Sequence, residues 1–407
     1  MTEIAAPAPL SGRSWFITGL GVAQISSWGS LYYSFPLIAA AMEPELGWSK
    51  TEIYGASTIG VLLSAVLSIP VGAAIDRGHG RWVMAGASIF AGALLALWGM
   101  MDSILLFYLA AAGVGALQAA TLYEPAFAVI ARRTGPTAAR GGITALTLWG
   151  GFASTIFVPL VQLLLDLYGW RQALGVLAGI NILLCASIYF LVIDPALDAP
   201  KLSQPPGTQR RPHLREALRN PVFWWLAVSF TAYAASFSAL LMHFYPMLVE
   251  RGFSQHMVVA AMALIGPAQV AGRVFIMAFG KGASGRLIGS VVVLGFPIAM
   301  AVFAWGPAEF LMVAGAAVLY GAANGMMTIV RGIIIPELVS KEDYGAINGA
   351  LVMPMTIARA LAPLGAAALW SWSGSYAGTM AAVVAAAALM TLTFWLAAAI
   401  SVNSRHS

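Results

Sequence analysis

Twelve long apolar stretches, separated by short polar breaks, constrain this chain of 407 residues more than any other feature. An α-helix needs about 20 apolar residues to cross the hydrocarbon layer of a bilayer. Only 9 % of the residues are charged, whereas a soluble domain uses roughly a quarter of its residues as charges. The sequence therefore predicts an all-α membrane protein with twelve transmembrane helices and excludes a soluble protein. The stretches lie near residues 15–42, 53–75, 82–101, 104–130, 142–165, 172–193, 222–247, 257–279, 287–305, 310–337, 345–370 and 376–401.

The positions of lysine and arginine predict the orientation of these helices, because both residues accumulate in cytoplasmic loops. The first stretch is too long for a signal peptide and lacks a small-residue cleavage site, so we expect it to be retained. With the N-terminus inside, fifteen basic residues are cytoplasmic and three, Lys50, Arg171 and Arg251, are external. An even number of spans then predicts that the N- and C-termini are both cytoplasmic.

The spans divide into two halves at a long polar break. We expect a six-helix bundle over 1–193, a cytoplasmic linker over 194–221 and a second six-helix bundle over 222–407. Short stretches of weak sequence similarity relate the two halves: Gly47-Trp-Ser-Lys50 aligns with Gly252-Phe-Ser-Gln255, and Gly80-Arg81 aligns with Gly285-Arg286. Parallel repeats of this kind are typical of transporters that open a central site to each side in turn.

The loop after the second span carries a longer motif, Gly72-Ala-Ala-Ile-Asp76-Arg77-Gly78-His79-Gly80-Arg81. It resembles the loop motif of the major facilitator superfamily, with His79 where an inner glycine usually stands. The resemblance covers the whole chain and implies the major facilitator fold. We call Gly72, Asp76, Arg77 and Arg81 the gate motif. Asp76 is expected to face a helix N-terminus. Arg77 and Arg81 are expected either to pair with carboxylates across the bundles or simply to anchor the cytoplasmic surface.

A narrower resemblance is to the monocarboxylate and oxalate/formate porters of that superfamily. The first external loop, Glu45-Leu-Gly-Trp-Ser-Lys-Thr-Glu52, is similar to the acidic and Gly-Trp-Ser-basic stretch of those porters. Arg273 and Arg359 match the places where the porters hold a carboxylate, and Tyr33 and Tyr123 fit the same cavity. The resemblance implies a transporter of a mono- or dicarboxylate.

Elementary energetics supports the same expectation for the two arginines. A charge at mid-membrane costs at least about 2.5 kcal/mol, so it faces a partner or a wet cavity. Arg273 and Arg359 therefore predict an anionic substrate, although either one can instead be a structural cation bonded to backbone carbonyls. The seventh span is unusually polar, which marks a cavity wall, and we place His243 among the substrate-binding residues. The other polar residues of the seventh span include Ser229, Thr231, Tyr233, Ser236 and Ser238.

Glu124 is a carboxylate well inside the fourth span, and it has two interpretations. It suits a residue that takes up and releases a proton during transport. Alternatively, the repeat offset places Arg331 at the level of Ala126, so Glu124 and Arg331 can form a salt bridge between the bundles. Proton symport and anion exchange both stay open, as does the direction of transport.

Two other functions compete with carboxylate transport. Aromatic and methionine-rich cavity walls also suit an exporter of amphipathic drugs or metabolites. Met242, His243, Met247, His256 and Met257 suggest, more weakly, a copper importer. A sensor that binds a ligand without moving it is a third alternative.

Several classes of site are not expected. The sequence has no Walker loop, no Gly-x-Ser-x-Gly elbow and no His-Glu-x-x-His helix, so we predict neither an enzyme nor a cofactor. The scattered basic residues do not indicate nucleic acid, and the single Cys185 indicates no metal site. The remaining expectations are a small organic anion and protons as ligands, a monomer, and the inner membrane of a bacterium.

Overall fold

The computed structural model describes residues 10–198, 213–280, 282–339 and 344–403, and every regular element in these ranges is helical. Ten helices of the described chain are long and apolar enough to cross a membrane. The central part of the predicted linker, residues 199–212, lies outside the described residues, as do both chain ends. The described chain forms two compact units, each treated separately below.

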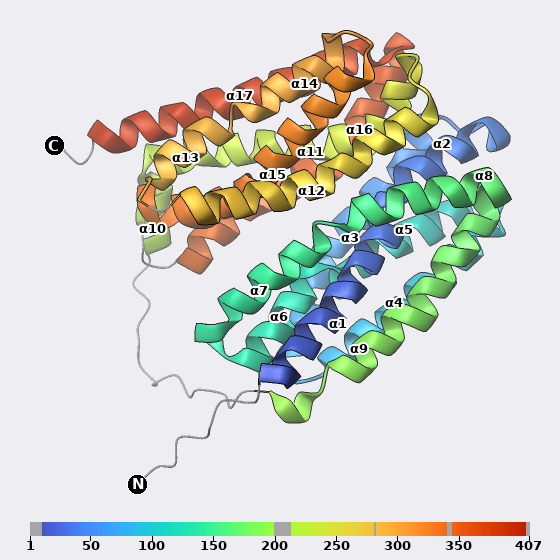
Figure 1. Ribbon diagram of the computed structural model, residues 1–407, viewed down its shortest axis with the longest axis horizontal. Coiled ribbons are helices and arrows are strands. Elements are labelled where there is room, and N and C mark those ends of the chain that lie inside the picture. The colour runs from blue at the N-terminus through green and yellow to red at the C-terminus, as the bar shows by residue number, and fades with distance from the viewer. Residues whose placement is uncertain (1–9, 199–212, 281, 340–343, 404–407) are drawn as a thin grey trace. The chain divides into compact units, whose positions relative to one another are not determined.

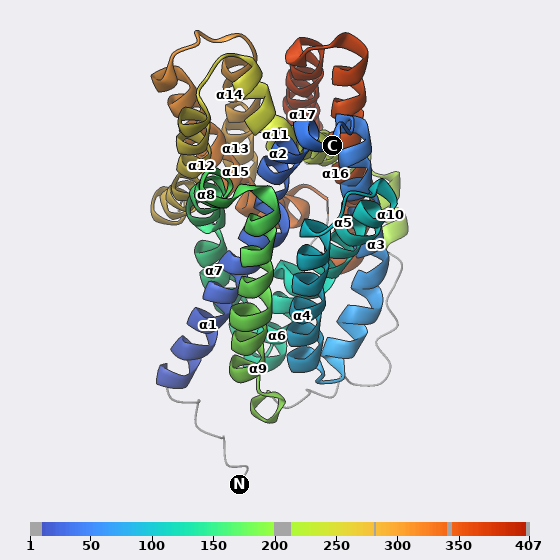
Figure 2. The same cartoon turned by 90° about the vertical axis from the view of Figure 1, so that its right-hand side faces the viewer.

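Unit 1 comprises Met1–Phe35 and Leu63–Leu202. Within it, α4 packs against α5, α8 and α9, and Figure 2 shows α4 beside α9. The elements of unit 1, besides the second half of α3 (Lys50–Asp76), are α1 (Leu10–Trp28), η1 (Gly29–Tyr33), α4 (Gly80–Gly99), α5 (Ile104–Thr121), α6 (Tyr123–Thr134), α7 (Pro136–Gly150), α8 (Ala153–Gly179), η2 (Ile180–Cys185), α9 (Ala186–Val192) and η3 (Pro195–Leu197).

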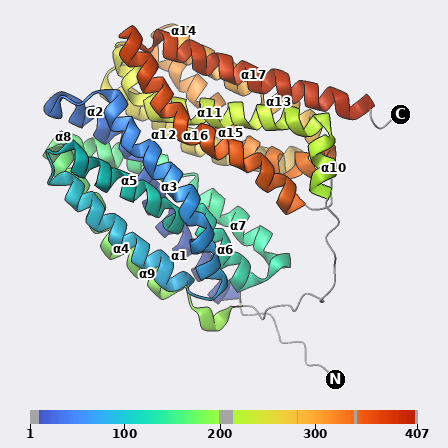
Figure 3. The same cartoon turned by 180° about the vertical axis from the view of Figure 1, so that it is seen from behind.

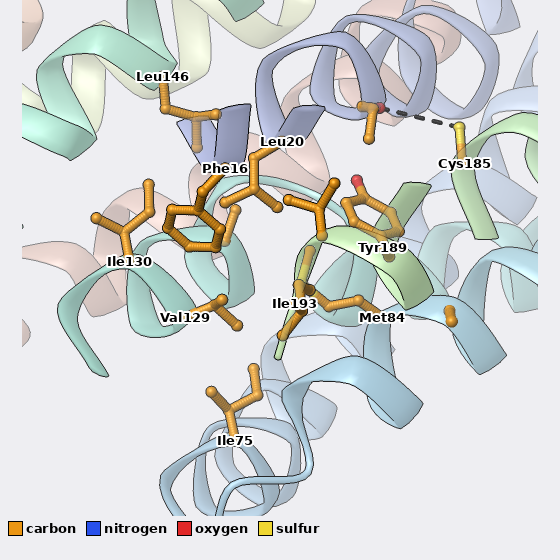
Figure 4. Close-up of a cluster of buried hydrophobic side chains, with 14 of the residues drawn as sticks. Phe16, Leu20, Ile75, Met84, Val129, Ile130, Leu146, Cys185, Tyr189 and Ile193 are labelled. Atoms are coloured by element: carbon orange, nitrogen blue, oxygen red, sulfur yellow. Dashed lines mark hydrogen bonds between the residues drawn. The ribbon is translucent and has the colours of Figure 1, made fainter. Parts of the chain in front are cut away.

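A cluster of buried apolar side chains from α1, α3, α4, α6, α7 and α9 forms a core of unit 1 (Figure 4). Phe16 and Leu20 of α1 face Val129 and Ile130 of α6, and the Tyr189 hydroxyl lies at the edge of the cluster. The dashed line in Figure 4 is the contact of 3.9 Å from Cys185 Sγ to the Ala23 carbonyl. Cys185 therefore packs in this core as a small apolar side chain.

Unit 2 comprises Pro36–Leu62 and Ser203–Ser407, so the N-terminal half of the second predicted span packs with this unit. Figure 3 shows α11 beside both α16 and α17, and these pairs are in extensive contact. Besides the first half of α3, its elements are α2 (Phe35–Leu46), α10 (His213–Arg219), α11 (Pro221–Glu250), α12 (Gln255–Phe279), α13 (Gly285–Val292), α14 (Gly295–Trp305), α15 (Phe310–Leu338), α16 (Tyr344–Ser373) and α17 (Tyr376–Asn403).

Side-chain caps mark the start of several helices of unit 2, including α11 and α12. The Asn220 side chain accepts a hydrogen bond of 2.9 Å from the backbone of Val222, and Pro221 occupies the first position of α11. Ser254 caps α12 in the same way through the backbone N–H of Met257. Such caps satisfy backbone donors that have no partner inside the helix.

Small residues allow α12 and α15 to pack unusually closely (Figure 1). A Cβ atom on Gly325 would lie 2.0 Å from the Gln269 carbonyl oxygen, and one on Gly272 would lie 2.4 Å from the Ala322 carbonyl oxygen. Close approach of backbones at glycine is a common way to associate helices in membranes. This contact fixes the residues that follow each glycine, including Arg273, relative to one another.

Two of the predicted spans differ from simple helices. The first stretch is interrupted by the π-helical turn η1, Gly29–Tyr33. The fifth and sixth predicted spans lie within one continuous apolar region, Gly141–Leu197, in which Gly169 adopts φ 75° and ψ 173°. Only glycine adopts this conformation without steric cost, so the chain changes direction there. The first predicted span is not among the ten candidates, and the fifth and sixth predicted spans fall within one of them, so ten candidates are found where the sequence predicts twelve spans.

Candidate functional site

Three arginines from three helices of unit 2 act electrostatically on one tyrosine. Arg273 of α12, Arg331 of α15 and Arg359 of α16 all influence the Tyr233 hydroxyl of α11. Arg273 is only 6 % exposed, and Arg331 and Arg359 are half-buried. We call these three residues the arginine cluster. Three guanidinium groups in a low-dielectric region produce a strong positive potential, which favours the binding of an anion.

Tyr233 is fixed in place by a hydrogen bond and by aromatic neighbours. Its hydroxyl donates to Asn324 Oδ1 of α15 at 2.5 Å, and both side chains are buried. The Tyr233 ring contacts Phe296 edge-on, with centroids 5.3 Å apart, and lies 5.9 Å from the Phe237 ring. The bond to Asn324 links α11 to the helix that carries Arg331.

The individual arginines have different surroundings. The Arg331 guanidinium lies over the Phe230 ring, 5.9 Å from its centroid, at the limit of a cation–π contact. Among the described residues, the buried Nε of Arg359 has no hydrogen-bond partner. A buried donor without a partner is costly, and a bound anion would supply the missing acceptor.

His243 lies in the interior of unit 2 with both ring nitrogens engaged. Nδ1 is 2.9 Å from the Tyr376 hydroxyl, Nε2 is 2.9 Å from the Pro363 carbonyl oxygen, and the ring stacks on Tyr54 at 4.2 Å. The side chain is 2 % exposed. The predicted substrate residue therefore has structural partners within its own unit, which also makes it a poor copper ligand.

The two predicted tyrosines lie in a group of aromatic rings in unit 1. Tyr33 is the last residue of η1, and its ring centroid is 6.2 Å from that of Trp28. Tyr123 opens α6 and lies 4.9 Å from Trp28. Among the described residues, the buried Trp28 Nε1 has no hydrogen-bond acceptor. The structure thus brings Tyr33 and Tyr123 to the same indole ring.

A break between α5 and α6 places Glu124 at a helix start. Pro125 has no N–H to bond to the Thr121 carbonyl, so this carbonyl loses its partner within the helix. Gln24 Nε2 and the Tyr189 hydroxyl donate to it instead, at 2.8 and 3.0 Å. Glu124 is in the first turn of α6, where a carboxylate is favoured by the helix dipole, and its side chain is exposed. Glu124 belongs to unit 1 and Arg331 to unit 2, and their pairing stays a prediction.

Two arginines of unit 1, Arg81 and Arg132, form ion pairs and a backbone hydrogen bond in and beside the gate motif. Arg81 forms an ion pair of 3.4 Å with Asp194 at the end of the same unit. Arg132 of α6 donates to the Asp76 carbonyl oxygen and forms an ion pair of 2.8 Å with Asp198. Asp76 and Arg77 are exposed, and a Cβ atom on Gly72 would meet open space. For Arg81, the carboxylate partner lies within unit 1; pairing across the bundles stays a prediction.

Sequence reasoning placed Tyr233 only among the polar residues of a cavity wall and missed Asn324 entirely. Asn324 lies in the run Gly321-Ala-Ala-Asn324-Gly325, where an amide stands among small residues in the middle of a span. An intramembrane amide of this kind needs a polar partner, which is the signal that could have identified it. Within the described residues, no group of three histidine, cysteine, aspartate or glutamate side chains could hold a metal ion.

Comparisons with known proteins agree with this architecture. Residues 20–295 match the model of the Major Facilitator Superfamily. An oxalate:formate antiporter of Oxalobacter formigenes is 29 % identical over 247 residues, which cover 57 % of this chain and 54 % of the relative. The matched region therefore spans about half the length of that curated relative.

Solved structures share the fold at low sequence identity. A nucleoside transporter, NupG (D323A mutant), superimposes with a TM-score of 0.76 at 13 % identity, over 95 % of this chain and 99 % of NupG. A bacterial homologue of the human lysosomal transporter Spinster, in an inward-facing and unoccupied conformation, gives a TM-score of 0.70 at 16 % identity, over 97 % and 99 %.

With the matched family model and the long apolar helices, the chain is a membrane transporter rather than an enzyme, and a multi-pass integral protein of the inner membrane. The chain belongs to the major facilitator superfamily.

Proposed function

We propose that this transporter moves a small organic anion, a mono- or dicarboxylate, by exchanging one anion for another. The arginine cluster is the observation that carries the proposal, because three cations of one unit lie within electrostatic range of Tyr233 and the buried Nε of Arg359 has no hydrogen-bond partner among the described residues. The similarity to an oxalate:formate antiporter supports anion exchange as the mode of coupling. Arg359 and Arg273 bind the carboxylate, and Arg331 adds to the positive potential that attracts it.

The aromatic residues of unit 1 complete the proposal. Tyr33 and Tyr123, held against Trp28, shape the wall that contacts the apolar part of the anion. Glu124 is exposed at the start of α6, so it is available for proton uptake or for a salt bridge that forms during the cycle. His243 is held in the interior of unit 2 by its contacts with Tyr376 and Pro363.

The test is uptake of labelled carboxylates into proteoliposomes under two conditions. In one, the vesicles are preloaded with unlabelled anion; in the other, they carry an inward proton gradient without internal anion. Exchange predicts uptake only in preloaded vesicles, whereas proton symport predicts uptake driven by the gradient. Arg359→Gln should abolish uptake. Arg171→Gln is the control, because this external arginine pairs with Asp102 at 2.6 Å, outside the arginine cluster.

We further propose twelve spans with both termini in the cytoplasm. Ten candidate helices are observed; adding the first stretch and counting the two sides of Gly169 separately gives twelve. Cysteines introduced as Thr2→Cys and Ser404→Cys, in a Cys185→Ala background, test the orientation. A membrane-impermeant maleimide should label both in inside-out vesicles and neither in intact cells. Labelling of either position in intact cells would contradict this topology.

A further inference from the structure

A proline lies four residues after Arg359 in α16. Proline has no N–H, so the carbonyl four residues before it loses its helical hydrogen bond. For Pro363 that carbonyl belongs to Arg359. In the structure, Ser238 Oγ of α11 donates to the Arg359 carbonyl oxygen at 2.8 Å. A side chain from another helix therefore replaces the bond that Pro363 removes.

The same replacement occurs at other prolines. The Thr121 carbonyl, freed by Pro125, accepts from Gln24 and Tyr189, as described above. Two further cases among the described residues are Met242, freed by Pro246 and bonded by the Tyr54 hydroxyl at 2.7 Å, and Val293, freed by Pro297 and bonded by Thr391 Oγ1 at 2.9 Å. Of these four residues with a freed carbonyl, only Arg359, which is bonded by Ser238, has a charged side chain.

Two side chains of α11 bond to the backbone of α16 at the first and last residues of the turn 359–363, whose helical hydrogen bond Pro363 removes. Ser238 bonds to residue 359, and His243, five residues later on α11, contacts the Pro363 carbonyl at 2.9 Å. From α3, Thr58 Oγ1 donates to the Ala360 carbonyl at 2.9 Å. Side chains of neighbouring helices thus bond to the α16 backbone at Arg359 itself and at two residues that follow it, Ala360 and Pro363. The direction of a long side chain depends on the backbone that carries it.

We propose that Ser238 is a positioning residue for anion binding: its bond to the Arg359 carbonyl fixes the backbone at the proline turn and so directs the guanidinium toward the anion. This inference rests on the proposed function. Loss of the bond leaves the residue 359 backbone free to shift, which misplaces the guanidinium without removing it. Weaker anion binding with a nearly unchanged turnover rate is the expected signature.

The test compares anion exchange by three variants in proteoliposomes. Ser238→Ala should raise KM for the exchanged carboxylate about tenfold, which corresponds to about 1.4 kcal/mol of binding free energy. Ser238→Thr retains the hydroxyl and should restore KM to within about twofold of the wild type. Thr391→Val is the matched control, because Thr391 Oγ1 of α17 likewise bonds to a carbonyl freed by a proline, that of Val293, at 2.9 Å, and not to α16.

Variants in a Pro363→Ala background test whether the missing N–H of Pro363 is the reason that anion binding depends on Ser238. Pro363→Ala supplies an N–H that can bond to the Arg359 carbonyl, so Ser238 becomes dispensable. In this background, Ser238→Ala should change KM less than about threefold. If Ser238→Ala alone does not fold, this comparison still tests the positioning role of Ser238, because the double variant with Pro363→Ala has a backbone N–H that can bond to the Arg359 carbonyl.

Each remaining outcome counts for or against the inference. Equal effects of Ser238→Ala and Thr391→Val on KM, or an undiminished effect of Ser238→Ala in the Pro363→Ala background, would overturn the positioning role and leave the proposed function intact. Wild-type vesicles that exchange no carboxylate would overturn both.

Discussion

The Tyr233 hydroxyl donates a hydrogen bond of 2.5 Å to Asn324 Oδ1, and this bond joins α11 to α15 within electrostatic range of the arginine cluster. Both partners are buried. The hydroxyl oxygen also lies under the electrostatic influence of three guanidinium groups. The pair therefore links the packing of unit 2 to the site that we propose for the anion.

Replacing Tyr233 with phenylalanine should affect both stability and binding. Tyr233→Phe leaves the buried Asn324 Oδ1 without its donor, which costs about 1–3 kcal/mol of unfolding free energy. KM for the exchanged anion should rise as well, because Asn324 and its helix lose their anchor. Denaturation in detergent and exchange in proteoliposomes measure the two effects. Tyr168→Phe, at an exposed position of α8, is the control. An unchanged stability and KM for Tyr233→Phe would show that the bond has no such role.

The break between α5 and α6 should depend on two side chains together. Tyr189→Phe and Gln24→Leu each remove one donor to the Thr121 carbonyl, and each should lower the free energy of unfolding by about 1 kcal/mol. The loss in the double variant should differ from the sum of the single losses, because the carbonyl then has no donor left and because Gln24 Nε2 also donates directly to the Tyr189 hydroxyl at 2.9 Å. Pro125→Ala restores an N–H at the break and should reduce the part of this difference that comes from the carbonyl. Strictly additive losses would argue against a shared acceptor.

The close approach of α12 and α15 gives a sharp contrast between two glycines of one helix. Gly325→Ala places a Cβ atom 2.0 Å from the Gln269 carbonyl oxygen, so the helices must separate. We expect a loss of about 1–3 kcal/mol in unfolding free energy, together with reduced transport, because Arg273 moves with α12. Gly315→Ala in α15 meets open space and should be neutral. Thermal unfolding in detergent compares them, and equal melting temperatures would contradict this packing.

Much of the fold could be predicted because hydropathy and charge act locally. The apolar stretches, the polar breaks and the motif after the second span are all visible without a structure. Interruptions inside a stretch were harder to predict. The π-helical turn at Gly29–Tyr33 and the change of direction at Gly169 depend on tertiary packing, which single-residue hydropathy does not record.

The candidate site was predicted only in part. Arg273 and Arg359 were identified because an intramembrane charge is costly, and the structure places both near Tyr233. Helical periodicity does not say which helices are neighbours, so the sequence linked Arg331 to Glu124 and not to Tyr233. The partners of His243 lie more than a hundred residues away along the chain and could not be inferred from local spacing.

The most direct test of the account is counterflow of a labelled carboxylate into proteoliposomes preloaded with unlabelled carboxylate, for the wild type and for Arg359→Gln. The account predicts rapid uptake of label by the wild type, none by Arg359→Gln, and wild-type uptake by the control Arg171→Gln. Uptake by Arg359→Gln equal to that of the wild type, or no carboxylate uptake by the wild type under any preloading, would contradict the claim that the arginine cluster binds a transported anion.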